Sequence, residues 1–489
     1  MIGTRIKRLS PAELPSAAEA LRAAGGRVQF AYAWSQAGKE PEVRYVSSLP
    51  SQIEFEMWVV AGYRELPSLA PLLPLLGWYE REMMDLYGIT FTGHPEPYPL
   101  ILRSGDGTHV NGNGPGGMTP TNGRPHLPDI DATEVQLLPF GPIRADVLES
   151  AEFTFLYVGE HIIHYQPRLF FKHRGMETCF EQSHPKCGVI IAERVSAVGS
   201  VAHSLAYCEA LERAAGCDVP TRARALRVLL AELERLYNHL HYLGHLCHTT
   251  TLKVGEAQGT LLEETAKQLN ARLTGSRFLR GVLTPGGLRR DLDPGKWLGN
   301  ALESLREEFA AYADRLEASE SHIDRLITTG LLPEKVAFDQ GASGPIERAS
   351  GLDRDLRRDH PYASYADLPL AVATSQDGDA YARERVRVAE IEASFVLCQR
   401  ILLLLEPGPI CVPCEPAPMA EGLGWAEGPR GSVFYAVHIG ADGVLARVKI
   451  KSPSFSNWRA FPITVHDTNM MDYAINEASF GLTMAGCDR

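Results

Sequence analysis

Residues 221–249 read TRARALRVLLAELERLYNHLHYLGHLCHT, and this stretch decides the fold class. Apolar residues recur along it at three- and four-residue steps, which is the spacing of an α-helix that buries one side. Pro220 stands immediately before it, where a proline suits the start of a helix. The same spacing recurs in residues 189–215, 256–274, 296–328 and 380–405. Such helices pack as a bundle, so the sequence predicts a mainly helical domain.

Two further segments predict β-hairpins at the periphery of this domain. Residues 152–165 (EFTFLYVGEHIIHY) alternate in polarity around a Gly-Glu turn. Residues 434–450 (FYAVHIGADGVLARVKI) have the pattern of a hairpin whose turn lies at Asp442 and Gly443. The domain is therefore expected to combine helices with short antiparallel strands.

The N-terminal part of the chain carries a different pattern. Residues 27–32 and 54–60 are rich in β-branched and aromatic side chains, while residues 66–84 have helical spacing. Residues 105–128 (GDGTHVNGNGPGGMTPTNGRPHLP) hold almost no large apolar side chain to offset the entropy of ordering. The sequence therefore predicts an α+β protein with a small α+β domain over residues 1–104, a linker over 105–128 and the mainly helical domain over 129–489.

The composition limits the range of functions. The chain has 489 residues, of which 45% are hydrophobic, so it can bury more than one core. Its net charge of -12 argues against nucleic acid as a partner, because phosphate binding needs a basic surface. Proline, glycine or charge interrupts every apolar run well short of the roughly 18–20 residues of a membrane-spanning helix. Residues 1–23 lack the apolar core of a secretory signal, so a cytoplasmic location is expected.

Cysteines and histidines offer two possible metal or redox sites. The nine cysteines are scattered, as expected for reduced thiols, and Cys411 and Cys414 form a C-x-x-C pair in a proline-rich segment. A zinc site needs a second ligand pair, so this pair is either a loop with two ordinary thiols or a redox or metal site. His241, His245 and His248 share one helix face, a spacing that suits either metal ligation or polar packing.

A charged motif identifies the N-terminal domain. Residues 78–95 read WYEREMMDLYGITFTGHP, in which Glu80, Arg81, Glu82 and Asp85 form one charged helical turn. The motif resembles the signature E-R-E-x-x-D-x-x-G-I-x-F-x-G-H-P of the smaller complex I peripheral-arm subunit. The family usually continues with two arginines, whereas this chain continues with Tyr98 and Pro99. The charged turn predicts a scaffold whose charges dock on a neighbour.

From Gly141 to Arg489 the chain resembles the large subunit of group 4 energy-converting [NiFe] hydrogenases and its complex I relative. The matching blocks, in one order, are residues 172–177 (KHRGME), 193–207, 232–239, 286–291 (GGLRRD), 344–362, 427–431 (EGPRG) and 449–458. The resemblance implies a subunit of a membrane-associated redox complex related to NADH:quinone oxidoreductase and hydrogenase. It also implies an iron-sulfur small subunit that carries a cluster, proton- or sodium-channel subunits of a membrane arm, and a peripheral position on the cytoplasmic face of the membrane.

The metal-binding motifs of these hydrogenases are altered here. The family holds nickel and iron with four thiolates, in R-x-C-G-x-C-x-x-x-H and D-P-C-x-x-C motifs, because such a centre needs soft sulfur donors. In this chain Ser196, Gly199, Thr483 and Gly486 stand at the four cysteine positions. The resemblance therefore predicts that the chain carries no NiFe centre and no cofactor of its own.

The quinone-binding pair of complex I relatives is altered as well. That pair is a histidine in the first hairpin and a tyrosine, since quinone reduction needs two protons and two hydrogen-bonding groups. Their positions correspond here to Arg144 and Ile191. Arginine keeps its proton near neutral pH, although it could hold an anion or an acidic head-group. Tyr157 and Tyr165 either replace the missing tyrosine or are core aromatics.

Several polar residues remain that the family places around the cavity, namely Glu177, Arg194, His203, Asp291 and Glu193. They are expected to form a proton relay or ligand site, or else Glu177 and Arg194 form a buried structural pair. Two functions therefore stay open, a subunit of an active redox complex and a catalytically silent structural or coupling subunit. An active hydrogenase or quinone reductase is a weaker third possibility, and the sequence leaves open whether the chain is an enzyme.

Overall fold

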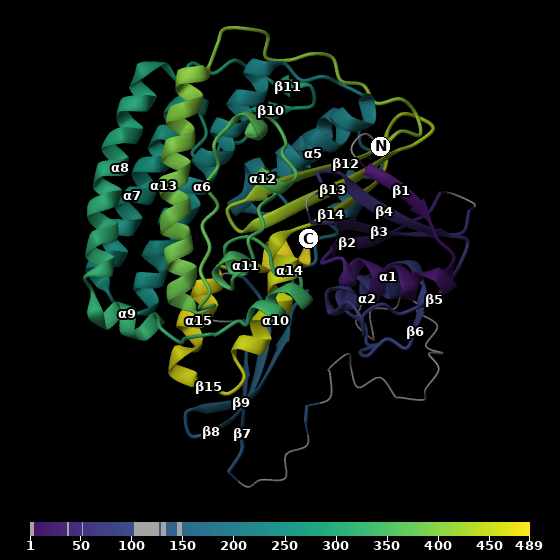
Figure 1. The fold of residues 1–489 in the computed structure, drawn as a ribbon, viewed down its shortest axis with the longest axis horizontal. Coiled ribbons are helices and arrows are strands. Elements are labelled where there is room, and N and C mark those ends of the chain that lie inside the picture. The colour runs from purple at the N-terminus through teal and green to yellow at the C-terminus, as the bar shows by residue number, and fades with distance from the viewer. Residues whose placement is uncertain (1–3, 37–38, 51, 102–126, 129–133, 144–148) are drawn as a thin grey trace. The chain divides into compact units, whose positions relative to one another are not determined.

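The computed structural model describes residues 4–36, 39–50, 52–101, 127–128, 134–143 and 149–489. It divides the chain into two compact units, one of Gly3–Leu138 with Asp339–Gly341 and one of Pro139–Phe338 with Ala342–Arg489. Both units combine helices and sheets, which confirms the predicted α+β class (Figure 1). The predicted linker lies outside the described residues except for 127–128.

The N-terminal unit is built on a four-stranded sheet with the order β1-β4-β3-β2. β1 runs parallel to β4, and the other neighbours are antiparallel. β2 is buried along its whole length, which matches its apolar and aromatic sequence. The elements are β1 (Thr4–Arg8), α1 (Leu14–Ala23), β2 (Arg27–Trp34), β3 (Glu42–Ser48), β4 (Phe55–Ala61), β5 (Glu65–Pro67), α2 (Gly77–Tyr87) and β6 (Thr90–Thr92).

The charged turn of α2 fixes neighbouring loops of its own unit. The buried Glu80 carboxylate accepts hydrogen bonds from the Ser68 hydroxyl at 2.5 Å and the Leu69 N–H at 2.8 Å. Asp85 accepts the N–H groups of residues 100 and 101 at 2.8 and 2.7 Å, and Arg81 donates to the Tyr98 carbonyl at 2.8 Å. Buried carboxylates need such donors. These charges therefore act as an internal scaffold.

Four long helices form the bundle of the larger unit. The central helix α6 (Thr221–Thr249) matches the predicted segment at both ends, and it packs on α7 (Lys253–Thr274) and α13 (Ala380–Leu404). α8 (Gly295–Glu317) packs on α7 and α13, so the four helices stand side by side in Figure 1. Most of α6 is buried because it is covered by neighbours on several sides.

Two predicted long helices are interrupted. The segment 189–215 was expected to be continuous, but α4 (Gly188–Ala192) ends before a turn and α5 (Ser200–Ala215) begins after it. Arg174, from a remote segment, donates to the carbonyls of Arg194 and Val195 at 3.1 and 2.6 Å and holds this turn. The segment 296–328 likewise breaks between α8 and α9 (Glu320–Leu326). Both continuous-helix predictions are therefore wrong.

Both predicted hairpins are confirmed. β12 (Glu421–Gly428), β13 (Gly431–Ile439) and β14 (Leu445–Lys451) form one antiparallel sheet, against which α5 packs. Gly422 and Gly424 allow this close approach, because a Cβ atom at Gly424 would clash with the Ala206 carbonyl oxygen. The second sheet has the order β15-β9-β8-β7 and consists of β7 (Gln136–Phe140), β8 (Glu152–Val158), β9 (His161–Arg168) and β15 (Thr468–Asn469).

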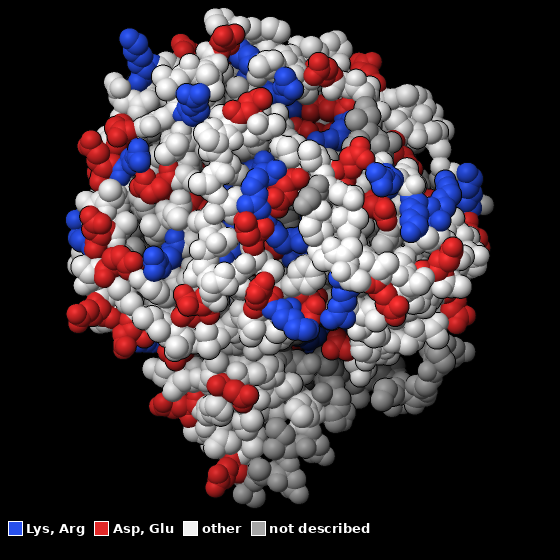
Figure 2. All heavy atoms as spheres, in the orientation of Figure 1, with Lys and Arg blue, Asp and Glu red and all other residues white. Residues whose placement is uncertain are grey.

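The remaining elements are short. They are α3 (Met176–Phe180), β10 (Leu283–Thr284), β11 (Gly287–Leu288), α10 (Glu334–Asp339), α11 (Pro345–Ala349), α12 (Leu356–Asp359), α14 (Pro453–Ala460), α15 (Tyr473–Phe480) and α16 (Met484–Asp488). No single helix of the described residues is both long and apolar enough to cross a membrane, and one pair with a 114° bend passes only when its two arms are combined. Acidic and basic side chains are interspersed on the face shown in Figure 2.

Candidate functional site

A small cavity lies where α5, the β12–β13 turn and the last helices of the larger unit meet. Its volume is about 20 Å³, which is room for about one water molecule. The turn before α5, the segment Gly428–Arg430 and the beginning of α14 supply most of its wall. The lining residues are Ser196, Val198, Gly199, Ala202, His203, Gly428, Pro429, Arg430, Val433, Ser452, Pro453, Ser454 and Gly486.

The four altered cysteine positions gather around this cavity. Ser196, Gly199 and Gly486 line it. Thr483 caps α16 directly behind, because its hydroxyl accepts the Gly486 N–H at 3.2 Å. A Cβ atom at Gly486 would lie 2.6 Å from the Thr483 hydroxyl oxygen and 3.4 Å from that of Ser196. The structure thus brings two motifs together that are almost three hundred residues apart in the chain.

These residues do not fit a nickel-iron centre. Two of the four positions offer neutral hydroxyl groups and two are glycines, whereas such a centre needs thiolate donors. Cys487 is fully buried, and burial raises the pKa of its thiol well above the usual range, which disfavours the thiolate that binds metal. Within the described ranges, no three or more His, Cys, Asp or Glu side chains are arranged to hold a metal ion.

His203 is the predicted relay residue that does line the cavity. Its side chain is buried, and its Nδ1 atom lies 3.0 Å from the Tyr435 hydroxyl oxygen. Burial, with a smaller contribution from the positive charge of Arg174, lowers the pKa of His203 to about 3. The imidazole is therefore neutral near pH 7. It can donate or accept one hydrogen bond toward the cavity but carries no charge there.

Glu177 lies in α3 and is surrounded by cations. Its carboxylate lies 2.7 Å from Arg447, 3.0 Å from Lys449 and 3.2 Å from Arg489. Burial alone would raise the pKa of this carboxyl group, but Lys449, Arg447 and Arg489 outweigh burial and lower it to about 2. A carboxylate that stays ionised at neutral pH is a poor proton carrier. The geometry favours a role in anchoring the C-terminal residue to β14.

Arg194 and Asp291 lie away from the cavity wall. The Arg194 side chain is 54% exposed and lies 3.6 Å from Glu193, so the expected Glu177–Arg194 pair is wrong. Asp291 is 55% exposed and pairs with Arg222 at 3.0 Å. Glu193 is buried and accepts the Gly281 N–H at 2.7 Å. Of the five polar residues expected around the cavity, only His203 lines it.

The structure describes only one of the two positions that correspond to the quinone pair. Arg144 lies outside the described residues. Ile191 lies in α4 and is partly buried. Tyr165 is buried among aromatic rings, with its hydroxyl oxygen 3.1 Å from that of Tyr473, so it is a core aromatic. The chain therefore shows no quinone pair within its described part.

The histidines and the C-x-x-C pair form no metal cluster in the described part of the chain. His241 and His248 each approach a carboxylate of α7, Glu263 at 3.0 Å and Glu256 at 2.9 Å. Cys414 is buried and Cys411 is exposed, so the two thiols have different environments.

Sequence reasoning missed two arginines of this site. Arg174 donates to the Val195 carbonyl at 2.6 Å and to the Ala485 carbonyl at 3.0 Å, so it ties the two altered motifs together. Arg430 lines the cavity and donates to the Gly481 carbonyl. Burial and the nearby charge of Arg387 lower the pKa of Arg430 to about 10. Both arginines belong to matching sequence blocks, KHRGME and EGPRG, which was the signal that could have found them.

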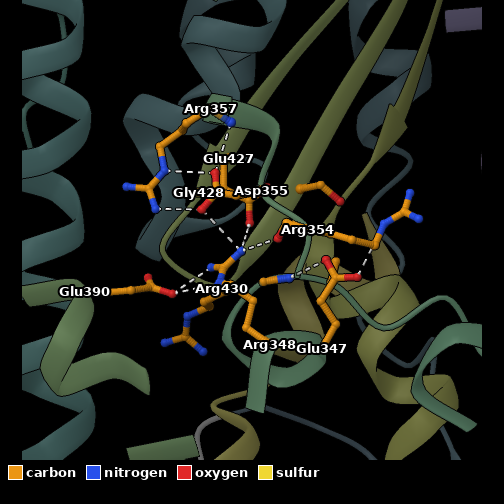
Figure 3. A network of polar contacts seen from close by, with 12 residues as sticks. Glu347, Arg348, Arg354, Asp355, Arg357, Glu390, Glu427, Gly428 and Arg430 are labelled. Carbon is orange, nitrogen blue, oxygen red and sulfur yellow. Dashed lines mark hydrogen bonds and ion pairs between the residues drawn. The ribbon is translucent and has the colours of Figure 1, made fainter. Parts of the chain in front are cut away.

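A network of buried charges lies beside the cavity (Figure 3). Arg348 lies 2.7 Å from Glu390, 3.2 Å from Glu427 and 3.4 Å from Asp355. Arg357 pairs with Asp355 at 2.7 Å. Burial, together with the charge of Asp355, raises the pKa of Glu427 to about 7. Each arginine of the network is thus paired with carboxylates that come from several elements.

Three family models match different parts of the chain. The model of the respiratory-chain NADH dehydrogenase 30 kDa subunit matches residues 8–110, and that of the 49 kDa subunit matches residues 262–419 and 414–489. The model of nickel-dependent hydrogenase matches residues 174–274.

Curated relatives cover most of the chain. Formate hydrogenlyase subunit 5 of Escherichia coli K12 is 32% identical over 417 residues, which cover 82% of this chain and 73% of the relative. Hydrogenase-4 component G of the same organism is 30% identical with the same two coverages. The C/D-type NADH-quinone oxidoreductase subunit of Acidiphilium cryptum is 26% identical, and the match covers 88% of this chain and 81% of the relative.

A solved structure shares the fold. A chain of the membrane-bound sulfane sulfur reductase, described as an archaeal respiratory membrane complex, matches with a TM-score of 0.69 at 24% identity. The match covers 74% of this chain and 100% of that one.

Proposed function

This chain belongs to the family that includes formate hydrogenlyase subunit 5 and hydrogenase-4 component G, and from that membership we propose that it is a subunit of a membrane-bound, energy-converting redox complex. The matches confirm the resemblance inferred from the sequence motifs. The family models match both predicted domains. The 30 kDa model matches residues 8–110, and the 49 kDa and hydrogenase models together match residues 174–489. The structural relative comes from a respiratory membrane complex, which supports the same assignment.

We further propose that the chain packs on an iron-sulfur small subunit at the cytoplasmic face of the membrane, next to ion-channel subunits of a membrane arm. In this proposal the iron-sulfur cluster belongs to the partner, and this chain holds no nickel or iron. The chemistry of the cavity carries the metal-free part of the proposal, because Ser196, Thr483 and two glycines stand where thiolates would be needed. In place of a metal, the cavity offers hydroxyl groups, a neutral imidazole and the Arg430 guanidinium.

A catalytically silent coupling subunit is the second candidate. The protonation states near the cavity favour it, because Glu177 stays ionised and His203 stays neutral around pH 7. Neither group can exchange a proton there without a large change in its surroundings. The chain would then transmit movements or assemble the complex while its partners perform the redox chemistry.

The test is purification of the complex through an affinity tag on this chain from membranes of its own host. We expect an iron-sulfur protein to copurify, with iron and acid-labile sulfide present and nickel well below one atom per chain. Stoichiometric nickel would contradict the proposed absence of a NiFe centre. Recovery of the chain without any membrane or iron-sulfur partner would contradict the proposed complex.

Variants of the cavity separate the two candidates. His203→Gln and Arg430→Gln should lower the redox turnover of the complex if the cavity takes part in the reaction. If both variants assemble fully and turn over like the wild type, the silent coupling role is supported. Arg400→Gln, an exposed change on α13, is the matched control.

A further inference from the structure

Three buried or partly buried arginines on α13 and after β12 have no carboxylate within ion-pair distance among the described residues, and one of them lines the cavity. They are Arg383, Arg387 and Arg430, and none of them forms an ion pair within 4.0 Å in that part of the chain. Their guanidinium groups donate instead to neutral carbonyl oxygens, Arg383 to those of Gly330 at 3.0 Å and Gly378 at 2.8 Å. Carbonyl groups satisfy the N–H donors, while carboxylates act on these charges only from beyond ion-pair distance, as Glu149 does on Arg430 and Glu390 on Arg387.

Two of these charges converge on one short segment beside the cavity. Arg387 donates to the Phe480 carbonyl at 3.3 Å, and Arg430 donates to the next carbonyl, that of Gly481. A Cβ atom at Gly481 would lie 3.6 Å from the Arg387 Nη2 atom and 3.7 Å from the Arg430 Nη1 atom. Gly481 precedes Thr483, which stands directly behind the cavity wall. These two guanidinium groups therefore lie close together beside this segment.

The carboxylates that act on Arg430 and Arg387, Glu149 and Glu390, make their direct contacts with other groups. Glu149 accepts the N–H groups of Met484 at 2.5 Å and Ala485 at 3.1 Å. Glu390 is held by Arg348 and by His239 at 2.9 Å. Since buried charges in proteins are normally paired directly, a cation at a cavity wall that has no direct ion pair, Arg430, indicates a site that can receive an anion.

The cavity wall supplies hydrogen-bond donors of the matching kind. The Ser196 side chain lines the cavity. The Ser454 hydroxyl lines it as well and lies 3.1 Å from that of Thr483. Hydroxyl groups and a guanidinium together recognise oxyanions, because both donate to charged oxygen atoms. The volume of about 20 Å³ has room for about one water-sized group, so a charged oxygen atom of the ligand enters it while the rest of the ligand stays outside.

We propose that this cavity binds a small oxyanion, with Arg430 as its charge partner and the Ser196 and Ser454 hydroxyls as hydrogen-bond donors. The inference rests on the proposed function in one respect, namely that no metal centre fills the cavity. The ligand class is a carboxylate or a sulfur or phosphorus oxyanion, since all three present charged oxygen atoms to the same donors. Arg387 lies at the same Gly481 segment as Arg430 and raises the positive potential that attracts the anion.

The test is calorimetric titration of the purified full-length chain with formate, sulfate and inorganic phosphate at constant ionic strength set with chloride. We expect at least one probe to bind saturably with one site per chain. Arg430→Gln should weaken that binding by roughly tenfold or more, because an oxyanion loses its only charged donor. Arg400→Gln removes the same charge from an exposed position and should bind like the wild type. The three probes distinguish the possible classes of oxyanion.

Three results overturn the inference. They are no saturable binding of any probe, equal binding by Arg430→Gln and wild type, and equal weakening by Arg400→Gln. If Arg430→Gln fails to fold, as shown by circular dichroism, Ser196→Ala carries the test and should weaken binding several-fold. Nickel is measured on the same samples. A nickel-containing chain refutes the proposed absence of a metal centre, whereas a nickel-free chain that binds no anion overturns the oxyanion site alone.

Discussion

The buried arginines of the larger unit fall into two groups with opposite electrostatic surroundings. Arg348 and Arg357 lie in a network with Glu390, Glu427 and Asp355, in which carboxylates compensate each positive charge (Figure 3). A few residues away on α13 and after β12, Arg383, Arg387 and Arg430 are held by carbonyl groups and have no ion pair in the described part of the chain. The larger unit therefore contains buried arginines that are paired with carboxylates and buried arginines that are held by carbonyl groups.

The difference separates stability from function. A compensated buried pair costs desolvation but recovers it in Coulomb attraction, so removing one partner leaves an unpaired charge and is strongly destabilising. An uncompensated buried cation carries the same desolvation cost without that recovery. Such a group is expected where a site uses its charge, and Arg430 of the second group lines the cavity.

The largest effect is expected in the compensated network. Arg348→Met leaves Glu390, Glu427 and Asp355 without their shared cation. We expect the free energy of unfolding to fall by about 3–5 kcal/mol, measured by urea denaturation of the purified chain. Arg400→Met, at an exposed position of α13, should change it by less than about 0.5 kcal/mol. Equal effects of the two substitutions would show that the network does not hold the fold.

The second effect concerns the other compensated cluster, around Glu177. The pKa of this carboxyl group is about 2 in the folded chain, below its usual 4.5, because Lys449, Arg447 and Arg489 outweigh the effect of burial. A lowered pKa stabilises the fold above the pKa of the unfolded chain, and that contribution is lost as the pH falls toward 2. Glu177→Gln should therefore lower the free energy of unfolding by about 2–3 kcal/mol at pH 7.

The pH dependence is the decisive measurement for Glu177. The difference between wild type and Glu177→Gln should shrink between about pH 5 and pH 2, as the wild-type carboxylate takes up its proton. Urea denaturation at pH 7, 5 and 3 follows this change. A difference that stays constant with pH would mean that Glu177 contributes through packing, and the cation cluster would then not belong to the compensated group.

The sequence predicted the helices well where one local pattern decides the structure. The spacing of residues 221–249 gave α6 with both ends correct, because apolar periodicity and Pro220 act within the segment itself. The same periodicity continues through residues 189–215, yet the chain turns there. Arg174 holds that turn through the carbonyls of Arg194 and Val195. A contact between such segments leaves no trace in the local pattern.

The site shows the same division. Two motifs near residues 196 and 483 were expected to form one site, and their positions meet at the cavity. The choice of partner by each charged side chain could not be predicted, because Glu177 selects Arg447, Lys449 and Arg489 from segments far away in sequence. Arg194 and Asp291 were expected nearby and instead lie exposed in other ion pairs. Burial and tertiary geometry decide these pairings.

A third substitution tests the uncompensated group. Arg387→Met removes hydrogen bonds to the carbonyls of Arg383 at 3.1 Å and Phe480 at 3.3 Å, and a contact with the Tyr242 ring 3.7 Å away. The same change relieves the desolvation of an unpaired charge, which offsets part of the loss. We expect unfolding to become easier by about 1–2 kcal/mol, clearly less than for Arg348→Met. A loss as large as that of Arg348→Met would remove the distinction between the two groups.

The smallest stability effect is expected at the cavity itself. Arg430 donates to one described carbonyl, that of Gly481, and lies partly exposed at the cavity wall. Arg430→Met should therefore change the free energy of unfolding by less than about 1 kcal/mol in either direction, since the lost hydrogen bond and the relieved charge nearly cancel. A loss of about 3 kcal/mol or more would place Arg430 with the compensated arginines. An effect this small would mean that the fold does not depend on the charge of Arg430, which leaves that charge available to a bound oxyanion.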